Sequence, residues 1–423
     1  MQIVSYSTPE VRRAVRIDVC AAVLSALFTA LTGPFTGLIL RRDLGATPFH
    51  LSALASANAA CLLMSLALTR VIDGRRPLAS VVWTTVIARS LFLLVPFIDS
   101  PWPFVSMLAM VTLIGTITTP AQAALVQQVY PREERGRALS VIRVAAAIAG
   151  IGLALFAGHF VGWSGYRVAF PFAAVFGIAA ALTLRRLPVP VVGTEVSPER
   201  PSLRLAWATI RRDSAFRRLL AASAVFGSGI WMMTPVTPLL QVDVLGVTTA
   251  QVGLFAAFAA ATAIVANLAW GRLADHHSSL TTLRTVYICG SLTPIIYYVA
   301  CTFVRTPWIL IAASISESLL ATGLDLVWML AVIDFAGPRR TAQYAAIGAT
   351  LAGVRGVIAP LISAALVHAV GLAPVYAVAA VLMATGALMV TLQIRGIRRE
   401  AVVAARSCAR AGLLRLREME LAR

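Results

Sequence analysis

Two carboxylates interrupt a long apolar stretch in the C-terminal half of the sequence. Glu317 and Asp325 lie within the apolar run from residue 308 to 335. A carboxyl group in hydrocarbon is stable only if it is paired or faces water, and burial favours its neutral form. Either group is therefore suited to take up and release a proton, or to meet a cationic ligand.

A structural ion pair is the alternative interpretation of the same residues. Arg355 lies deep in the run from residue 345 to 370 and is a plausible partner for Asp325, in which case the pair locks two helices together. The sequence supports both interpretations equally. Arg89, in the run from 78 to 97, is a second arginine among apolar residues, and the sequence indicates no partner or role for it.

Other polar residues recur at helical spacing near these charges. At ~100° per residue, Ser318, Asp325 and Trp328 share a narrow arc with Ser314, and Glu317 lies at its edge. Three more apolar runs carry such stripes: Thr29, Thr32 and Thr36; Thr112, Thr116, Thr119 and Gln122; and Trp231, Thr234, Pro238 and Gln241. A single threonine in such a run usually bonds to its own helix backbone. Four stripes together favour a water-filled cavity between helices.

Composition determines which elements carry these residues. Of 423 residues, 59% are hydrophobic and 13% are charged, and the mean hydropathy is +0.83. Twelve apolar runs of roughly 18 to 25 residues are long enough to cross a bilayer as helices. We therefore expect an all-α integral membrane protein with twelve spans.

The arginines indicate orientation. A net charge of +18 would suggest nucleic-acid binding in a soluble protein, but here the arginines are concentrated in alternate loops between apolar runs. Positive residues favour the cytoplasmic side. The pattern predicts a protein of the inner (plasma) membrane with both termini in the cytoplasm and no nucleic-acid partner.

The two halves of the chain repeat each other. Residues 33–38 align with 234–239, and 44–47 with 245–248, with proline, threonine, leucine and glycine in register. Pro34, and Pro235 with Pro238, predict bends at equivalent places in the first and seventh spans. The expected units are a cytoplasmic tail (1–17), a six-helix half (18–186), a basic linker (187–218), a second half (219–394) and a basic tail (395–423). The last is either an amphipathic helix on the inner leaflet or a solvated segment.

Two loops resemble a known signature. The segment Gly271-x-Leu273-Ala274-Asp275, with Arg272, resembles part of the pattern Gly-x-Leu-Ala-Asp-Arg-x-Gly-Arg-Arg that the major facilitator superfamily carries after its second and eighth spans. The first copy keeps only the Gly-Arg-Arg end of the pattern, as Gly74, Arg75 and Arg76; the position of the pattern's Asp falls on Val71, and Asp73 lies next to Gly74. With the topology, the linker and the repeat, the resemblance covers about residues 15 to 395.

The resemblance implies a fold and a mode of action. It implies two pseudo-symmetric six-helix halves, a substrate site between them lined by spans one, four, seven and ten, and alternating access by rocking of the halves. We expect Gly271 to let a neighbouring helix approach closely. We expect Asp275 to cap or pair with a helix end across its loop.

The sequence contains no residue pattern that indicates an enzyme. There is no phosphate-binding glycine-rich loop, no metal-ligand cluster and no Ser-His-Asp arrangement that the topology would assemble, and the five cysteines lack Cys-x-x-Cys spacing. We therefore predict no enzymatic activity, no cofactor and no metal.

Secondary transport is the function that the residues favour. We predict a monomer in the lipid bilayer that exports a small amphipathic or cationic compound in exchange for protons, because the polar stripes are sparse and the carboxylates few. Two alternatives stay open: an importer of a sugar or organic anion, and a non-transporting receptor or assembly protein on a transporter scaffold. Residue types alone do not fix the substrate, the direction, the coupling ion or the oligomeric state.

Overall fold

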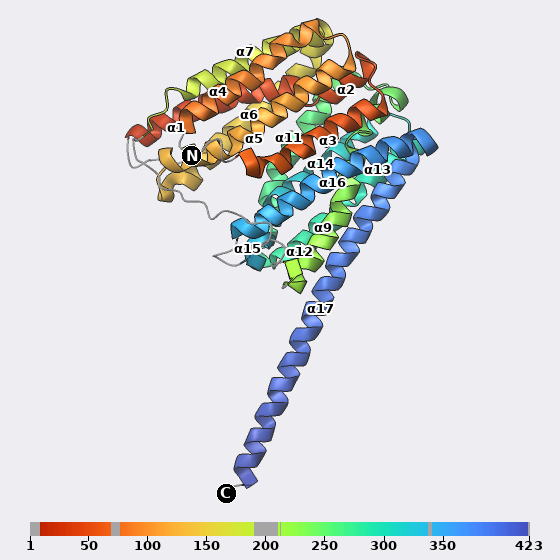
Figure 1. The fold of residues 1–423 in the computed structure, drawn as a ribbon. Helices are drawn as coiled ribbons and strands as arrows, with labels where there is room; N and C mark the ends of the chain where they lie inside the picture. Colours follow the sequence, from red (N-terminus) through yellow and green to blue (C-terminus); the bar gives the residue numbers. More distant parts are fainter. Residues whose placement is uncertain (1–8, 69–76, 190–209, 212, 337–340, 422–423) are drawn as a thin grey trace.

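The computed structural model describes residues 9–68, 77–189, 210–211, 213–336 and 341–421, and the elements found there are helices (Figure 1). The first half contains α1 (Pro9–Thr32), α2 (Thr36–Arg42), α3 (Pro48–Leu68), α4 (Pro77–Ser90), the 3-10 helix η2 (Leu91–Phe97), α5 (Pro101–Val129), α6 (Arg132–Ser164) and α7 (Tyr166–Leu184). Because η2 continues α4, and α2 continues α1 after a short turn, these elements make six hairpin-connected spans.

The second half has the same plan. It contains α9 (Ser214–Met233), α10 (Thr237–Leu239), η3 (Leu240–Val244), α11 (Thr249–His276), α12 (Ser279–Gly290), α13 (Leu292–Thr302), α14 (Ile309–Gly323), η4 (Leu324–Trp328), α15 (Met329–Ala336), α16 (Thr341–Val370) and α17 (Leu372–Leu421). The elements η3 and η4 are π-helical turns within longer spans.

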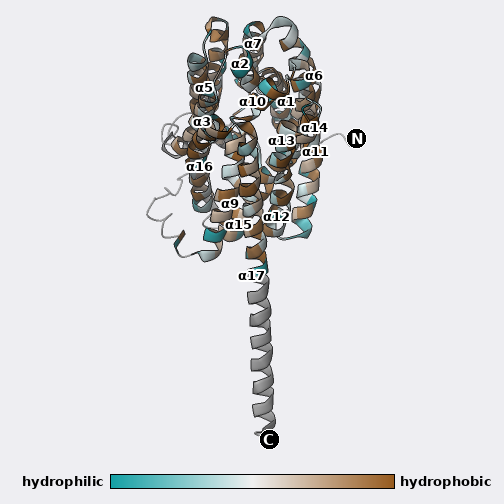
Figure 2. Ribbon diagram, turned by 90° about the vertical axis from the view of Figure 1, so that its right-hand side faces the viewer, coloured by the Kyte–Doolittle hydropathy of each residue, from teal (hydrophilic) through white to brown (hydrophobic). Residues whose placement is uncertain are grey.

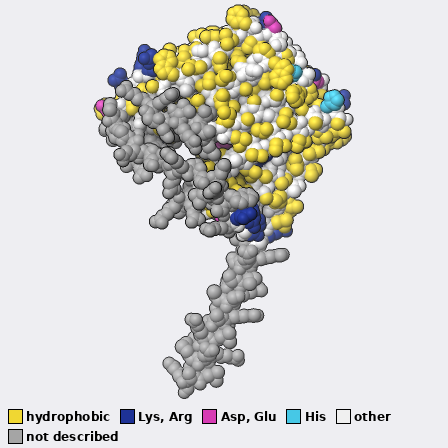
Figure 3. All heavy atoms as spheres, in the orientation of Figure 1, with side chains coloured by type: hydrophobic (Ala, Val, Ile, Leu, Met, Phe, Trp, Pro, Cys, Tyr) yellow, Lys and Arg dark blue, Asp and Glu magenta, His cyan; other side chains and the backbone are white. Residues whose placement is uncertain are grey.

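The apolar runs are helices of membrane-spanning length. Within the described residues, eleven helices are long and apolar enough to cross a bilayer, and a shorter apolar helix, Pro48–Met64, lies where the second span is expected. Hydrophobic residues dominate the middle of the bundle, and hydrophilic ones gather near its ends (Figure 2). The outer surface is correspondingly apolar (Figure 3), with exposed side chains such as Trp83, Ile148 and Val265. A twelve-span fold accounts for these features.

The internal repeat is visible in the backbone. The first span breaks after Thr32 and resumes at Thr36, and the seventh breaks after Met233 and resumes at Thr237, so the bends expected at the prolines are confirmed. Both spans end in a glycine with positive φ, Gly45 (68°) and Gly246 (57°), a conformation that disfavours other residues. Equivalent hydrogen bonds close the two turns, from Ala46 N to Leu40 O (2.9 Å) and from Val247 N to Gln241 O (2.8 Å).

Small residues bring the two halves into contact. A Cβ on Gly253 of α11 would lie 2.8 Å from the Gly158 Cα of α6, and one on Gly158 would lie 2.8 Å from the carbonyl oxygen of Thr249. The α6 and α11 backbones therefore touch, as small residues allow in membrane helices. On the other side of the bundle, α16 packs along α3, where Ala59 lies against Gly356.

The two ends of the bundle differ. We call the end where α1 begins and α7 ends the linker face, and the end that carries the turns at Gly45 and Gly246 the distal face. At the distal face the halves meet directly: the Arg41 guanidinium binds the Asp243 carboxylate through Nε (3.0 Å to each oxygen) and Nη2 (2.9 Å). Nearby, a Cβ on Gly37 would lie 2.6 Å from Pro238 Cγ.

Helix ends depart from the expected boundaries. The first helix begins at Pro9, so residues 9–17 extend the first span instead of forming a separate tail. The twelfth span continues without a break to Leu421 in α17, which carries the expected C-terminal tail past the other helices (Figure 1). The position of this tail relative to a membrane stays a prediction.

Candidate functional site

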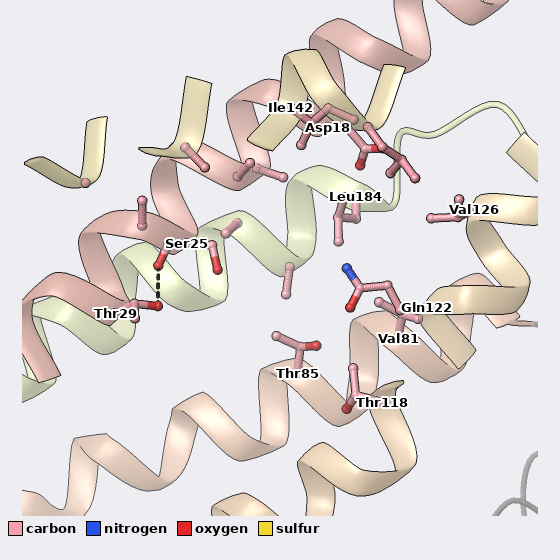
Figure 4. A pocket seen from close by; sticks show the side chains of 18 of the residues that line it. Asp18, Ser25, Thr29, Val81, Thr85, Thr118, Gln122, Val126, Ile142 and Leu184 are labelled. Carbon is pink, nitrogen blue, oxygen red and sulfur yellow. Dashed lines mark hydrogen bonds between the residues drawn. The ribbon is translucent and has the colours of Figure 1, made fainter. Parts of the chain in front are cut away.

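A cavity of about 680 Å³ lies inside the first half. It is lined by α1, α4, α5, α6 and α7, with Ala256 and Ala260 of α11 contributing from the second half (Figure 4). Most lining side chains are aliphatic. It extends from Pro34, in the turn after α1, along α1 to Asp18, and it reaches the linker face beside Tyr130 and Leu187. This volume suits a small organic molecule.

One carboxylate lines this cavity. Asp18 of α1 is half-buried, and it accepts a hydrogen bond of 2.5 Å from the hydroxyl of Tyr130, which follows α5. In the described part of the chain, no arginine or histidine forms an ion pair with Asp18. A carboxylate in an apolar cavity without a cationic partner attracts cations.

Neutral hydrogen-bonding groups line the cavity between its ends. Gln122 of α5 is exposed to the cavity and its side chain points between the helices, near Thr85 and Thr118 (Figure 4). The Thr118 hydroxyl donates to the Thr84 hydroxyl (2.8 Å), whereas the Gln122 amide has no hydrogen bond to any described residue. Gln122 was expected to line a cavity, and it does.

Arg89 lies at the deeper part of the same cavity. The sequence indicated no partner for it, but the structure supplies two neutral ones: Nη1 donates to the Gly177 carbonyl of α7 (2.6 Å) and Nη2 to the Ser25 hydroxyl of α1 (2.5 Å). The guanidinium carbon lies 4.9 Å from the centre of the Phe28 ring. The arginine thus joins three helices.

The tenth span lies outside this cavity. Glu317 of α14 lies near Tyr297 of α13, and Tyr297 stacks on Tyr376 of α17 with centroids 5.3 Å apart. The Ser318 hydroxyl donates to the Ala259 carbonyl of α11 (2.6 Å). These contacts hold α14 to its neighbours.

Asp325 and Trp328 lie in the π-helical turn η4. Asp325 is exposed and forms no hydrogen bond with a described residue, whereas Trp328 packs against Gly348 of α16. A π turn changes the angle between successive residues, so the single arc expected from Ser314 to Trp328 does not persist through η4.

The expected pair between Asp325 and Arg355 is absent from the described residues. The Arg355 guanidinium instead reaches α9, where Nη1 donates to the Ser223 carbonyl and, at 3.1 Å, to the Ser223 hydroxyl, and it lies against Gly227. Gly227 leaves the space that the guanidinium occupies. The arginine therefore binds α16 to α9, and Asp325 is left free of it.

The threonine stripes consist mainly of back-bonded hydroxyls. Thr116 donates to Leu113 O (2.6 Å), Thr119 to Gly115 O (3.1 Å) and Thr234 to Ile230 O (3.1 Å). Trp231 packs against Gly356 of α16, and Gln241 lies half-buried at the start of η3. None of these five side chains lines the cavity of the first half.

The residues of the second signature loop, Gly271 to Asp275, do not make the contacts expected of them. A Cβ on Gly271 would meet no described atom within 4 Å, so none of the described helices approaches it closely. The start of α12 is capped by Ser278, whose hydroxyl accepts from Thr281 N (3.3 Å), while Arg272 and Asp275 are exposed and form no ion pair with described residues. The first loop, with Asp73, Gly74, Arg75 and Arg76, lies outside the described residues.

The profile of the Major Facilitator Superfamily matches residues 19–316 of this chain. The chain belongs to the Major Facilitator Superfamily. The repeated turns and the two six-helix halves agree with this assignment. The loop motifs thus identified the family, although Gly271 and Asp275 form none of the expected contacts.

Solved structures of the superfamily have the same fold. A bacterial homolog to the human lysosomal transporter Spinster, in an inward-facing and occupied conformation, has a TM-score of 0.66 at 14% identity, and the match covers 92% of this chain and 98% of that chain. A mutant of the nucleoside transporter NupG has a TM-score of 0.66 at 13% identity, covering 90% of this chain and 99% of that one. A search of the curated proteins gives no match.

The superfamily fold brings Asp18 and Tyr130 together, and sequence reasoning missed both. The signal was present: Asp18, Ser25 and Thr29 recur at helical spacing along α1, so the threonine stripe continues to a carboxylate. Asp18 was placed at the boundary of an expected tail. Its partner Tyr130 lies 112 residues away, and nothing in the local sequence predicts that contact.

Proposed function

We propose that this protein is a secondary active transporter that exports a small amphipathic cation from the cytoplasm in exchange for protons. It acts as a monomer in the plasma membrane, with both termini in the cytoplasm. The observation that carries the proposal is Asp18, a carboxylate in a mostly aliphatic cavity of about 680 Å³ with Tyr130 as its hydrogen-bond partner.

The cavity wall supports an amphipathic cation as the substrate. Apolar lining removes the carbon skeleton of a ligand from water, and a carboxylate in such surroundings attracts a positive group more strongly than it would in water. A sugar would need more hydrogen-bonding groups than Gln122 and the nearby threonines provide. An amphipathic cation contacts both the apolar side chains and the carboxylate of the cavity wall.

The two faces of the bundle support export as the direction of transport. The halves are joined at the distal face by Arg41 and Asp243, while the cavity reaches the linker face beside Tyr130. The arginine-rich ends of the spans support a cytoplasmic position for the linker face. In this state a cytoplasmic substrate has access to Asp18 and an external one does not.

The tenth span is our candidate for proton coupling. Asp325 and Glu317 are both exposed, and Asp325 is unpaired among the described residues, whereas Glu317 lies near Tyr297. A carboxylate in a spanning segment is stable where water reaches it, and it then exchanges protons as access alternates. We assign the coupling proton to Asp325, with Glu317 as the second candidate.

Growth of a pump-deficient host on toxic lipophilic cations such as ethidium tests the export function. At matched membrane levels, the wild type should raise the inhibitory concentration several-fold, and Asp18→Asn should remove the gain. Asp43→Asn is the matched control, since Asp43 follows α2 on the same span and pairs with Arg42 outside the cavity. Equal resistance from wild type and Asp18→Asn would refute the role of Asp18, and no resistance from either would refute cation export.

A further inference from the structure

Arg89 places a positive charge in the cavity, and no carboxylate of the described residues pairs with it. Its two hydrogen bonds go to neutral groups, the Gly177 carbonyl and the Ser25 hydroxyl, and among the described residues it forms no ion pair. A guanidinium carries five N–H donors. Three of them are therefore left without a partner in the described structure.

A helix-joining role alone explains this arginine poorly. Burying a charge among apolar side chains is unfavourable unless it is paired, and a neutral side chain could bridge a carbonyl and a hydroxyl without that cost. The chain also leaves room for Arg89, because its aliphatic part lies over Gly177, where any larger residue would collide with it. The guanidinium is placed at the cavity wall and not at the bundle surface.

We propose that Arg89 is an anion-binding group of this cavity, and that the transported compound is a zwitterion whose anionic group meets Arg89 while its cationic group meets Asp18. The part of this proposal that concerns the cationic group and Asp18 rests on the proposed function. The anionic half rests on Arg89 alone. Such a compound has no net charge, and it neutralises both charges of the wall when it binds.

The helix geometry fixes the spacing of the two groups. Arg89 holds Ser25, which lies seven residues after Asp18 on the uninterrupted helix α1. At 1.5 Å per residue the two charges are ~10 Å apart along the helix. Between them the wall is mainly aliphatic, with Gln122 and Thr85 as polar groups. The ligand is therefore a long zwitterion with an apolar or weakly polar middle.

Binding of matched probes to the purified protein tests this proposal. The first probe is a trimethylammonium group joined to a carboxylate by an alkyl chain that separates the charges by ~10 Å, the spacing along α1. The second is its methyl ester, which keeps the cation and removes the anion. Glycine betaine, whose charges are too close together to reach both residues, is the spacing control.

The wild type should bind the long zwitterion at least about tenfold more tightly than its ester, as expected for a charge-assisted pair. Arg89→Gln should bring this ratio to about one while the ester binds as in the wild type. Arg89→Lys should keep part of the preference, because it keeps the charge. Arg355→Gln is the matched control: like Arg89, Arg355 donates to a backbone carbonyl and to a serine hydroxyl, but it lies outside the cavity, so the ratio should not change.

Two results would overturn the proposal. In the wild type, which needs no folding control, equal binding of zwitterion and ester would show that the cavity has no anion site. A loss in Arg89→Gln that is equal for both probes would reduce Arg89 to a structural residue. Asp18→Asn separates the two proposals. If this variant binds the ester as tightly as the wild type does, the cation site at Asp18 is refuted. If it still binds the zwitterion more tightly than the ester, the anion site at Arg89 remains supported.

Discussion

The polar residues that line the cavity differ in whether they have hydrogen-bond partners. Asp18 is bonded to Tyr130 and Arg89 to Ser25 and Gly177, whereas the Gln122 amide points into the space without a hydrogen bond to a described residue. A free amide can bind a ligand without first breaking a protein contact. Gln122 is therefore the residue most available for neutral hydrogen bonding to the substrate.

Replacing Gln122 should weaken binding without affecting the fold. Gln122→Ala removes one ligand hydrogen bond worth about 0.5–1.5 kcal/mol, so the KM of a substrate with a hydrogen-bonding group should rise roughly two- to tenfold. Gln127→Ala is the control, since Gln127 lies on the same helix outside this cavity. Flux measured in membrane vesicles gives both values, and equal KM for the two variants would contradict the assignment.

For single residues, the sequence predicted which residue types line a cavity better than it predicted which residues they contact. Gln122 lines the cavity as expected, but Arg355 binds Ser223 and not Asp325, and Asp18 was missed. Helical spacing shows which residues share a face of one helix. It does not show which helix that face meets, because such contacts depend on packing between segments far apart in the chain.

At the scale of single elements, η4 alters the tenth span. The π turn from Leu324 to Trp328 rotates Asp325 and Trp328 relative to Ser318, so that the polar arc assumed at ~100° per residue ends at Gly323. π turns are rare and often lie at functional sites. Composition gives no signal for one here, which is why the sequence could not predict it.

Asp325→Asn should separate coupling from substrate movement. If Asp325 carries the coupling proton, the variant should lose accumulation driven by a pH gradient, by about tenfold or more, because an amide cannot release a proton. Exchange of labelled for unlabelled substrate should continue, since the cavity is intact. Glu317→Gln should keep the driven accumulation. Loss of both driven accumulation and exchange in Asp325→Asn would contradict the assignment.

The contact between α6 and α11 predicts a second effect at this scale. Gly158→Val would push a side chain into the backbone of Thr249 and Ala250, and such overpacking costs about 1–3 kcal/mol. We expect a fall in the thermal unfolding temperature and in transport. Gly152→Val on the same helix, where no atom lies within 4 Å of a Cβ, should change neither strongly. Similar unfolding temperatures for the two variants would argue against this contact.

At the scale of the whole molecule, the repeat and the spans follow directly from the sequence. The twelve apolar runs, the proline bends and the repeat depend on local residue types, which is why they could be predicted. The ion pair between Arg41 and Asp243 could not be predicted, because its two residues lie 202 positions apart in the chain. They stand at nearly equivalent places in the two halves. That pair closes the distal face.

Weakening this pair should open the distal face. Exposed ion pairs contribute ~0.2–1 kcal/mol, so Arg41→Ala should raise labelling of a Gln122→Cys reporter by an external thiol reagent about two- to fivefold in an otherwise cysteine-free protein. Arg42→Ala, which breaks a pair within one half, should not raise it. Exchanging the charges, with Arg41→Asp and Asp243→Arg together, should restore the low labelling. Unchanged labelling in Arg41→Ala would show that the pair does not hold the face closed.

Driven transport in sealed proteoliposomes tests proton-coupled export through the Asp18 cavity. With an acidic interior and neutral exterior, protein that exchanges protons for cations should accumulate ethidium inside the vesicles, and collapse of the pH gradient should release it. Asp18→Asn, at equal protein content, should fall to the level of empty liposomes. Gradient-independent ethidium levels in the wild type, or equal accumulation by the wild type and Asp18→Asn, would contradict proton-coupled export through this cavity.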